Sequence, residues 1–443
     1  MKKYLSCNRI LVVVVILLAL LHIALLSVSP PGFFLDESAG AAHVVAMLQH
    51  GTNAHGQAWP LFSASLGGGY TTPIYLYPLV GWAALFGTSE LALRAFSLAA
   101  TFAAIAAIAC TAMLWKGRRF GLITAAVSLA LPWGWIQGSV AWDPALVPVF
   151  VAVPLLIFSI LIRTKQQNRF VTAALLVVLS LSLVALAYLY PPARVTAPLL
   201  FLGYYIVLLF RNIISYRLAF VVCLLSLLAA LPLAAFMFQP ESLERSRELS
   251  IFHGQSIFGG AIIFIGNILQ LINPVFLFVT GDANLRHSTG VQGMLGLASL
   301  PAVIILAVAA FRAVVTRPVA RTLIHNSTVQ LLLLCTAGVI FSITGSALTN
   351  EGQPHSLRAT AAWPFFAIIL AIGWYKLLDQ RRAIRTTAIS LFVIATAAYI
   401  IDVALYYPIR SHDAFDTDII HQLQAGKDIL DYPDLSKQYY QTR

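Results

Sequence analysis

The sequence ILVVVVILLALLHIALLSVSPPGFFLDES occupies residues 10–38 and decides the fold class. Its first part, residues 10–28, is an apolar run about as long as the roughly 20 residues that a helix needs to cross a bilayer core. Similar runs recur along the chain, which is 59% hydrophobic and only 10% charged. A soluble domain carries about 25% charged residues. Because backbone in lipid must satisfy its own hydrogen bonds, the runs predict an all-α, polytopic helical membrane protein.

The loops between the apolar runs are of two alternating kinds. One kind is basic, as at residues 116–119 and 376–385, and the other contains acids and single arginines. Lys and Arg favour the cytoplasmic side, and with the basic loops placed there every acid except Asp379 falls outside. The pattern predicts a multi-pass protein of the cytoplasmic (plasma) membrane, with its N-terminus inside and its C-terminus outside. The eleven expected spans are residues 10–28, 93–115, 120–138, 145–162, 170–188, 196–210, 218–237, 292–311, 327–347, 359–375 and 387–405.

The net charge of +11 follows from these helix ends and does not indicate a nucleic-acid partner.

The expected parts are one transmembrane domain at residues 1–410, with external loops at about 29–92 and 238–291, and a short external tail at 411–443. The two loops contain the apolar stretches 74–86 and 257–279. Counting either stretch as a single span would invert every later loop, so we predict interfacial or re-entrant helices there. A helical hairpin within 257–279 would also preserve the topology.

Asp36 and Glu37 stand side by side just beyond the first expected span, in a chain with only 17 acidic residues. A carboxylate at the membrane surface can act as a general base toward an attacking hydroxyl or amine, or bind a divalent cation. The alternative is that Asp36 caps a helix from Glu37 to about His50. Asp143 precedes Pro144 and is either a second acid that binds acceptor or metal, or the cap of the next helix. The use of a metal stays open.

Several cationic side chains fall near the outer ends of the expected spans, against the usual placement of arginine. Taken singly, each can be a contact to lipid headgroups. As a set, they predict an anionic ligand such as a phosphate or pyrophosphate. Two prolines at residues 191–192 are expected to break the helix just before Arg194, one member of this set. The set comprises Arg94, Arg194, Arg286, Arg358, His287 and His355.

Three other histidines have simpler interpretations. His22 lies within the first expected span, where we predict that it packs internally and hydrogen bonds a neighbouring helix. His43 and His50 are seven residues apart and are expected to share a solvated helical face, with a metal site as the alternative.

The order of these pieces resembles the GT-C superfamily of integral membrane glycosyltransferases, and within it the branch of protein O-mannosyltransferases and the aminoarabinose transferase of lipid A. The chain departs from that pattern in three places, one being that no folded external domain is expected after the last span. Its acidic pair is Asp-Glu rather than Asp-x-Asp, and it has Gly138-Ser139-Val140 where relatives often have an arginine. The matching pieces are the acidic pair after the first span, the segments 73–87, 89–94, 132–144 and 188–198, and the later loop segments 276–287 and 348–358.

The resemblance implies a hexosyl- or pentosyltransferase that uses a polyprenyl-phosphate-linked sugar donor and inverts the anomeric carbon. Asp36 would be the catalytic base, and Glu37 would help to orient the acceptor, an unknown glycan, lipid or protein. The implied ligands of the donor phosphate are Arg94, Arg194 and Arg358, and the implied substrate-lining residues are Tyr188 and Tyr190.

Other functions fit a polytopic chain of this kind. A transporter or flippase of lipid-linked glycans would place ionisable residues in mid-membrane and often contains repeats, whereas these spans are nearly free of acids. A polymerase or ligase of lipid-linked glycans shares the donor chemistry. A non-catalytic membrane scaffold is a further alternative.

Overall fold

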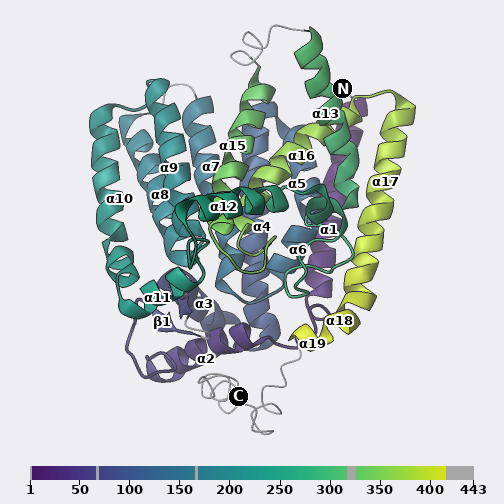
Figure 1. Ribbon diagram of the computed structural model, residues 1–443. Helices are drawn as coiled ribbons and strands as arrows, with labels where there is room; N and C mark the ends of the chain where they lie inside the picture. Colours follow the sequence, from purple (N-terminus) through teal and green to yellow (C-terminus); the bar gives the residue numbers. More distant parts are fainter. Residues whose placement is uncertain (1, 66–68, 165–167, 317–325, 416–443) are drawn as a thin grey trace.

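Long α-helices that run side by side dominate the molecule (Figure 1). The computed structural model describes residues 2–65, 69–164, 168–316 and 326–415. Within them, ten helical segments are long and apolar enough to cross a membrane, or eleven when α5 and α6, which meet at 65°, count as one span. The prediction of an all-α, multi-pass membrane protein is therefore confirmed. The long helices are α1 (Lys2–Leu25), α4 (Glu90–Lys116), α5 (Arg118–Ala130) with α6 (Pro132–Gly138), α7 (Val147–Arg163), α8 (Arg169–Leu189), α9 (Ala193–Phe210), α10 (Tyr216–Met237), α13 (Leu300–Thr316), α15 (Ser327–Ala347), α16 (Trp363–Leu378) and α17 (Arg382–Ile401).

One expected span differs clearly from its helix at the N-terminal end. The run at 292–311 was expected to be helical throughout, but α13 begins only at Leu300, after the short 3-10 turn η4 (Leu297–Ser299). The cause is a contact with a distant part of the sequence. Met294 N–H donates to the Phe276 carbonyl at 3.2 Å, and Leu295 N–H donates to the Leu277 carbonyl at 2.7 Å. This pairing holds the start of the apolar run in a buried turn outside the helix.

The apolar stretch 257–279 forms α12 (Ile257–Leu271) and a single π-helical turn, η3 (Val275–Val279). By length and composition alone this stretch also qualifies as a span. Figure 1 shows that α12 lies crosswise to the long helices, a direction that a single span would not take. Asn267 on α12 donates from Nδ2 to the Ala347 and Thr349 carbonyls, at 3.0 and 3.1 Å, and so ties the helix to the end of α15.

Short elements gather at the end of the bundle opposite the N-terminus (Figure 1). The hairpin among them pairs Ser63 with Thr71 and Ala64 with Tyr70. Residues 416–443, most of the expected external tail, lie outside the described residues, so the domain division stays a prediction. The remaining short elements are α2 (Leu35–His50), β1 (Ser63–Ala64), β2 (Tyr70–Thr71), α3 (Pro73–Phe86), η2 (Asp143–Leu146), α11 (Pro240–Glu248), η5 (Thr360–Ala362), η6 (Asp402–Tyr406), α18 (Tyr407–Arg410) and α19 (His412–Phe415).

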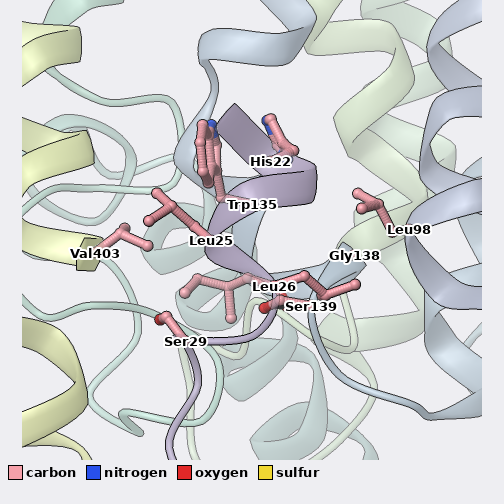
Figure 2. Close-up of a pocket in the computed structure, with 10 residues that line it drawn as sticks. His22, Leu25, Leu26, Ser29, Leu98, Trp135, Gly138, Ser139 and Val403 are labelled. Carbon is pink, nitrogen blue, oxygen red and sulfur yellow. Dashed lines mark hydrogen bonds between the residues drawn. The ribbon is translucent and has the colours of Figure 1, made fainter. Parts of the chain in front are cut away.

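His22 packs inside the bundle as predicted. Its Nε2 donates to the Leu129 carbonyl on α5 at 3.0 Å, and its ring stacks on Trp135 at 3.6 Å between centroids. Figure 2 shows the two rings side by side above a cavity of about 10 Å³. A cavity of that size holds one water at most, so this place is a packing contact and not a substrate site.

Candidate active site

The first turn of α2 is held by a buried ion pair. Glu37, 1% exposed, accepts hydrogen bonds from Arg94 Nε at 2.9 Å and from an Arg94 terminal nitrogen at 2.8 Å. Its two oxygens also accept the backbone N–H groups of Phe34 at 2.9 Å and Ala141 at 2.7 Å. One carboxylate thus joins α2, α4 and the loop before α7.

Arg94 uses four of its five N–H groups on protein partners in this arrangement. Besides Glu37, its guanidinium donates to the Pro30 and Gly32 carbonyls, and the side chain is 6% exposed. The roles expected for Arg94, as a ligand of the donor phosphate, and for Glu37, in orienting the acceptor, stay predictions. In the structure the two side chains pair with each other and fix the start of α2.

Asp36 lies in the first turn of α2 and is exposed. The helix begins at Leu35 with Phe34 as its N-cap, so the idea that Asp36 caps a helix from Glu37 is wrong. The capping contact comes instead from Glu37, whose carboxylate reaches back to the Phe34 N–H. Asp36 is therefore held by a fixed helix start while its own carboxylate faces solvent.

Asp143 comes from a different part of the chain and lies next to Asp36. It is the first residue of the turn η2, with Trp142 as the N-cap and Pro144 in the first turn. Its carboxylate interacts electrostatically with Asp36 and, with the opposite sign, with Arg194. The two acids that the sequence singled out are thus brought together, with an arginine beside them.

Arg194 enters the site because the helix breaks as predicted. α8 ends at Leu189 and α9 begins at Ala193, with the two prolines between them. The Arg194 Nε is buried and has no hydrogen-bond partner among the described residues. A guanidinium whose Nε–H is not used by the protein can still donate a hydrogen bond to an anion.

Tyr190 and Arg358 complete the group. Burial raises the pKa of the Tyr190 phenol, Arg358 opposes the rise, and Asp143 and Asp36 add to it. All four side chains are therefore close enough to interact. Arg358 also donates to Thr349 Oγ1 at 2.9 Å and pairs with the exposed Glu351 carboxylate at 3.0 Å.

Tyr75 on α3 belongs to the same group, and the sequence analysis assigned it no role. Its hydroxyl is buried without a hydrogen-bond partner among the described residues. Burial, then the charges of Asp143 and Glu37, raise its pKa well above the ordinary value. The phenol therefore stays protonated and remains a donor beside the acids. No local pattern marks it, because an aromatic residue in an apolar helix usually packs in the core.

Tyr188 does not share this position, although it was expected to line the substrate site. Its hydroxyl donates to the Ala229 carbonyl at 3.0 Å and accepts the Leu233 N–H at 3.2 Å. Both backbone groups belong to α10 and lie on either side of Pro232. Tyr188 thus joins α8 to α10.

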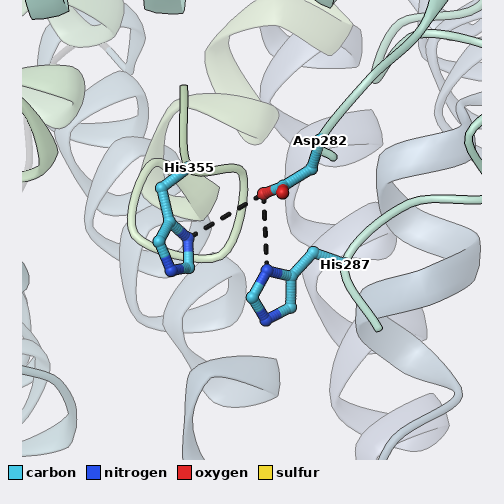
Figure 3. A group of neighbouring side chains, drawn as sticks. All are labelled: Asp282, His287 and His355. Atoms are coloured by element: carbon cyan, nitrogen blue, oxygen red, sulfur yellow. Dashed lines mark ion pairs between the residues drawn. The ribbon is translucent and has the colours of Figure 1, made fainter. Parts of the chain in front are cut away.

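The remaining cations of the phosphate set lie in the loops around this group. Arg286 stacks over the Phe34 ring at 4.2 Å, next to the start of α2. His287 and His355 do not stand alone as phosphate ligands, because they meet at the Asp282 carboxylate (Figure 3). A tyrosine-to-backbone contact fixes that loop, with Tyr407 Oη donating to the Leu285 carbonyl at 2.6 Å.

The prediction that His43 and His50 share a solvated helical face is wrong for His43. This side chain is fully buried, bonds the Ala64 carbonyl through Nε2 at 3.0 Å, and accepts the Ala54 N–H at Nδ1. Burial, then the charge of His55, lower its pKa to about 4. His43 therefore stays neutral and joins α2 to the hairpin loop.

Comparison with known proteins gives a likeness in structure alone. No protein-family model matches the chain, and no curated protein matches its sequence. ArnT from Cupriavidus metallidurans, crystallised bound to undecaprenyl phosphate, superposes with a TM-score of 0.57 at 14% identity, over 97% of this chain and 75% of that one. An oligosaccharyltransferase from Archaeoglobus fulgidus, tethered with an acceptor peptide, gives 0.49 at 13% identity, over 97% of this chain and 58% of that one. The likeness to ArnT shows the fold.

Proposed function

We propose that this chain, which has the fold of the GT-C membrane glycosyltransferases, is itself a glycosyltransferase that takes a hexose or pentose from a polyprenyl-phosphate donor. One observation carries the proposal. Asp143 interacts with Asp36 and with Arg194, and Tyr190 interacts with both acids and with Arg358. ArnT, which shares the fold, binds undecaprenyl phosphate, a lipid phosphate of the proposed class.

Asp36 is the proposed general base. It accepts the proton of the acceptor hydroxyl or amine as that group forms a bond to the anomeric carbon of the sugar. The bond from that carbon to the phosphate oxygen breaks on the opposite face, so the configuration inverts and polyprenyl phosphate leaves. Asp143 is proposed to bind the acceptor or share a divalent cation with Asp36, two roles that its position beside Asp36 supports.

Arg194 and Arg358 are the proposed ligands of the donor phosphate. Negative charge grows on the phosphate as it leaves, and fixed cations at that point stabilise the transition state. Arg194 offers a buried Nε without a partner. Arg358 is bound on one side by an exposed carboxylate, Glu351, which an incoming phosphate can displace. Arg94 is omitted from this set because its guanidinium is buried against Glu37 and four of its five N–H groups have protein partners.

Glu37 is proposed to position the base and not to touch the acceptor. Its four hydrogen bonds fix Glu37 itself, which directly follows Asp36 in the chain. Through the Ala141 N–H they also fix the loop that leads to Asp143. Fixing both acids from one buried point keeps them at a constant separation, as a preorganised site requires. The active site is proposed to face the outside of the cytoplasmic membrane, where the charge pattern of the loops puts it.

The test is to reconstitute the purified protein in liposomes with a panel of polyprenyl-phosphate hexoses and pentoses. Mass spectrometry would follow donor consumption and release of polyprenyl phosphate. The proposal predicts that at least one donor is consumed when candidate acceptors are present. Movement of a lipid-linked sugar across the bilayer, without release of polyprenyl phosphate from any donor, would refute it in favour of a transporter.

A further inference from the structure

A compact group of three ligand-type side chains lies in the two loops beside the proposed active site. Asp282 and His287 come from the loop between η3 and η4, and His355 comes from the loop between α15 and α16. The His287 Nδ1 lies 3.4 Å from Asp282 Oδ2, and the His355 Nδ1 lies 3.9 Å from the same oxygen. Figure 3 shows both rings directed at the carboxylate from opposite loops.

The group is buried and one of its nitrogens lacks a partner. Asp282 is 5% exposed and His287 is 7% exposed. Among the described residues the His287 Nδ1 has no hydrogen bond of good geometry, and its nearest acidic oxygen is Asp282 Oδ2 at 3.4 Å. A buried nitrogen without a partner is destabilising unless something else binds it.

The third ligand atom of the group, His355 Nδ1, has a competing backbone contact. The His355 Nδ1 already accepts the Arg358 N–H, but only at 3.4 Å. That bond is long enough for a metal to compete with it.

The spacing is close to that of a zinc site. Zinc bonds to histidine nitrogen and carboxylate oxygen at about 2.0–2.2 Å in tetrahedral sites, which places neighbouring ligand atoms about 3.3–3.5 Å apart. All three ligand atoms here lie within 4.8 Å of one another. Small side-chain rotations would therefore close the group around one ion.

The carboxylate is oriented by its surroundings, as metal ligands commonly are. Asp282 Oδ2 accepts the Ser356 N–H at 2.7 Å and the Ser356 hydroxyl at 3.0 Å, and Oδ1 accepts the Asn284 N–H at 2.9 Å. A cavity of about 460 Å³ is lined by Asp282 and by Pro354, the neighbour of His355. It gives an ion a route to the group.

We propose that Asp282, His287 and His355 bind a single divalent transition-metal ion of the zinc type. The ion joins the 280–290 loop to the 350–358 loop, and the second of these carries Arg358. The alternative is that the three side chains only hydrogen bond one another. This inference does not depend on sugar transfer, and its test measures no activity.

The experiment begins with purified protein treated with a chelator and returned to buffer. It is then incubated with ZnCl₂, desalted and analysed by mass spectrometry for bound metal. We expect about one zinc per chain, which raises the thermal unfolding temperature. His287→Gln and His355→Gln should each lower zinc affinity by roughly tenfold or more, as loss of ordered ligands does.

His55→Gln is the matched control, because His55 bonds the Ala64 carbonyl in another loop and should leave zinc binding unchanged. Cobalt(II) provides a test that needs no variant, since a tetrahedral site with histidine ligands gives intense visible absorption that zinc then removes. The proposal is overturned if the native chain retains no zinc and shows no such absorption. Equal zinc binding by His287→Gln, His355→Gln and the control would overturn it too.

Discussion

Replacing Glu37 with glutamine removes the charge at the centre of the buried ion pair while keeping the shape of the side chain. The carboxylate accepts four hydrogen bonds, and Arg94 is 5% exposed. A glutamine turns one acceptor into an NH₂ group that faces donors and leaves the guanidinium buried without a counter-charge. Removing one partner of a buried ion pair costs about 3–5 kcal/mol. We expect a loss of that size in the free energy of unfolding.

The assay is reversible unfolding in mixed micelles, with Glu351→Gln as the control. Glu351 also pairs with an arginine, at 3.0 Å, but its side chain is 69% exposed. Exposed ion pairs contribute about 0–1 kcal/mol, so the control should unfold almost like the native chain. If Glu37→Gln costs no more than Glu351→Gln, the reasoning that the buried pair fixes α2 is refuted.

Three further changes test other parts of the structure. Gly345→Ala should cost about 1–3 kcal/mol by overpacking, because a Cβ there overlaps the Pro192 carbonyl; an unchanged unfolding temperature would contradict this contact. Tyr188→Phe should cost about 1–3 kcal/mol in the same assay, since it removes two hydrogen bonds between α8 and α10. Burial lowers the pKa of His43 to about 4 from 6.5, so stability should fall as pH decreases between those values, where the unfolded chain binds the proton first. His43→Gln should flatten that decline in unfolding curves measured across pH.

The fold could be predicted from the sequence because lipid leaves the backbone few choices. Run length and loop charge were enough to find the long helices, including the break at residues 191–192. The start of α13 could not be found in this way. Residues 294–295 are as apolar as those that follow, but they bond to residues 276–277, and Gly296 with a φ of +68° separates them from the helix.

The candidate site was predicted in part. Asp36, Asp143, Arg194 and Arg358 were each named from residue type and place, and the structure puts them within interaction distance. Which cations would be occupied by protein partners could not be read from the sequence. Arg94 is 57 residues from Glu37, and no short-range pattern links the two.

The histidine cluster shows the same limit of local patterns. Asp282 and Ser356 are 74 residues apart and come from separate loops, so no metal-ligand spacing appears along the chain. Two histidines that the sequence placed in the phosphate-binding set are therefore seen to meet at Asp282 only when the loops are folded together.

The central claim, that Asp36 is the base of a sugar transfer, is tested most directly by one comparison. Initial rates of polyprenyl phosphate release would be measured for the native chain, Asp36→Asn and Asp379→Asn in the same liposomes. Asp379 pairs with Arg119 at 3.1 Å and belongs to a different loop. Losing a general base lowers the rate by about 10²–10⁴, so Asp36→Asn should fall by that factor while Asp379→Asn keeps the native rate. A native rate in Asp36→Asn would contradict the account.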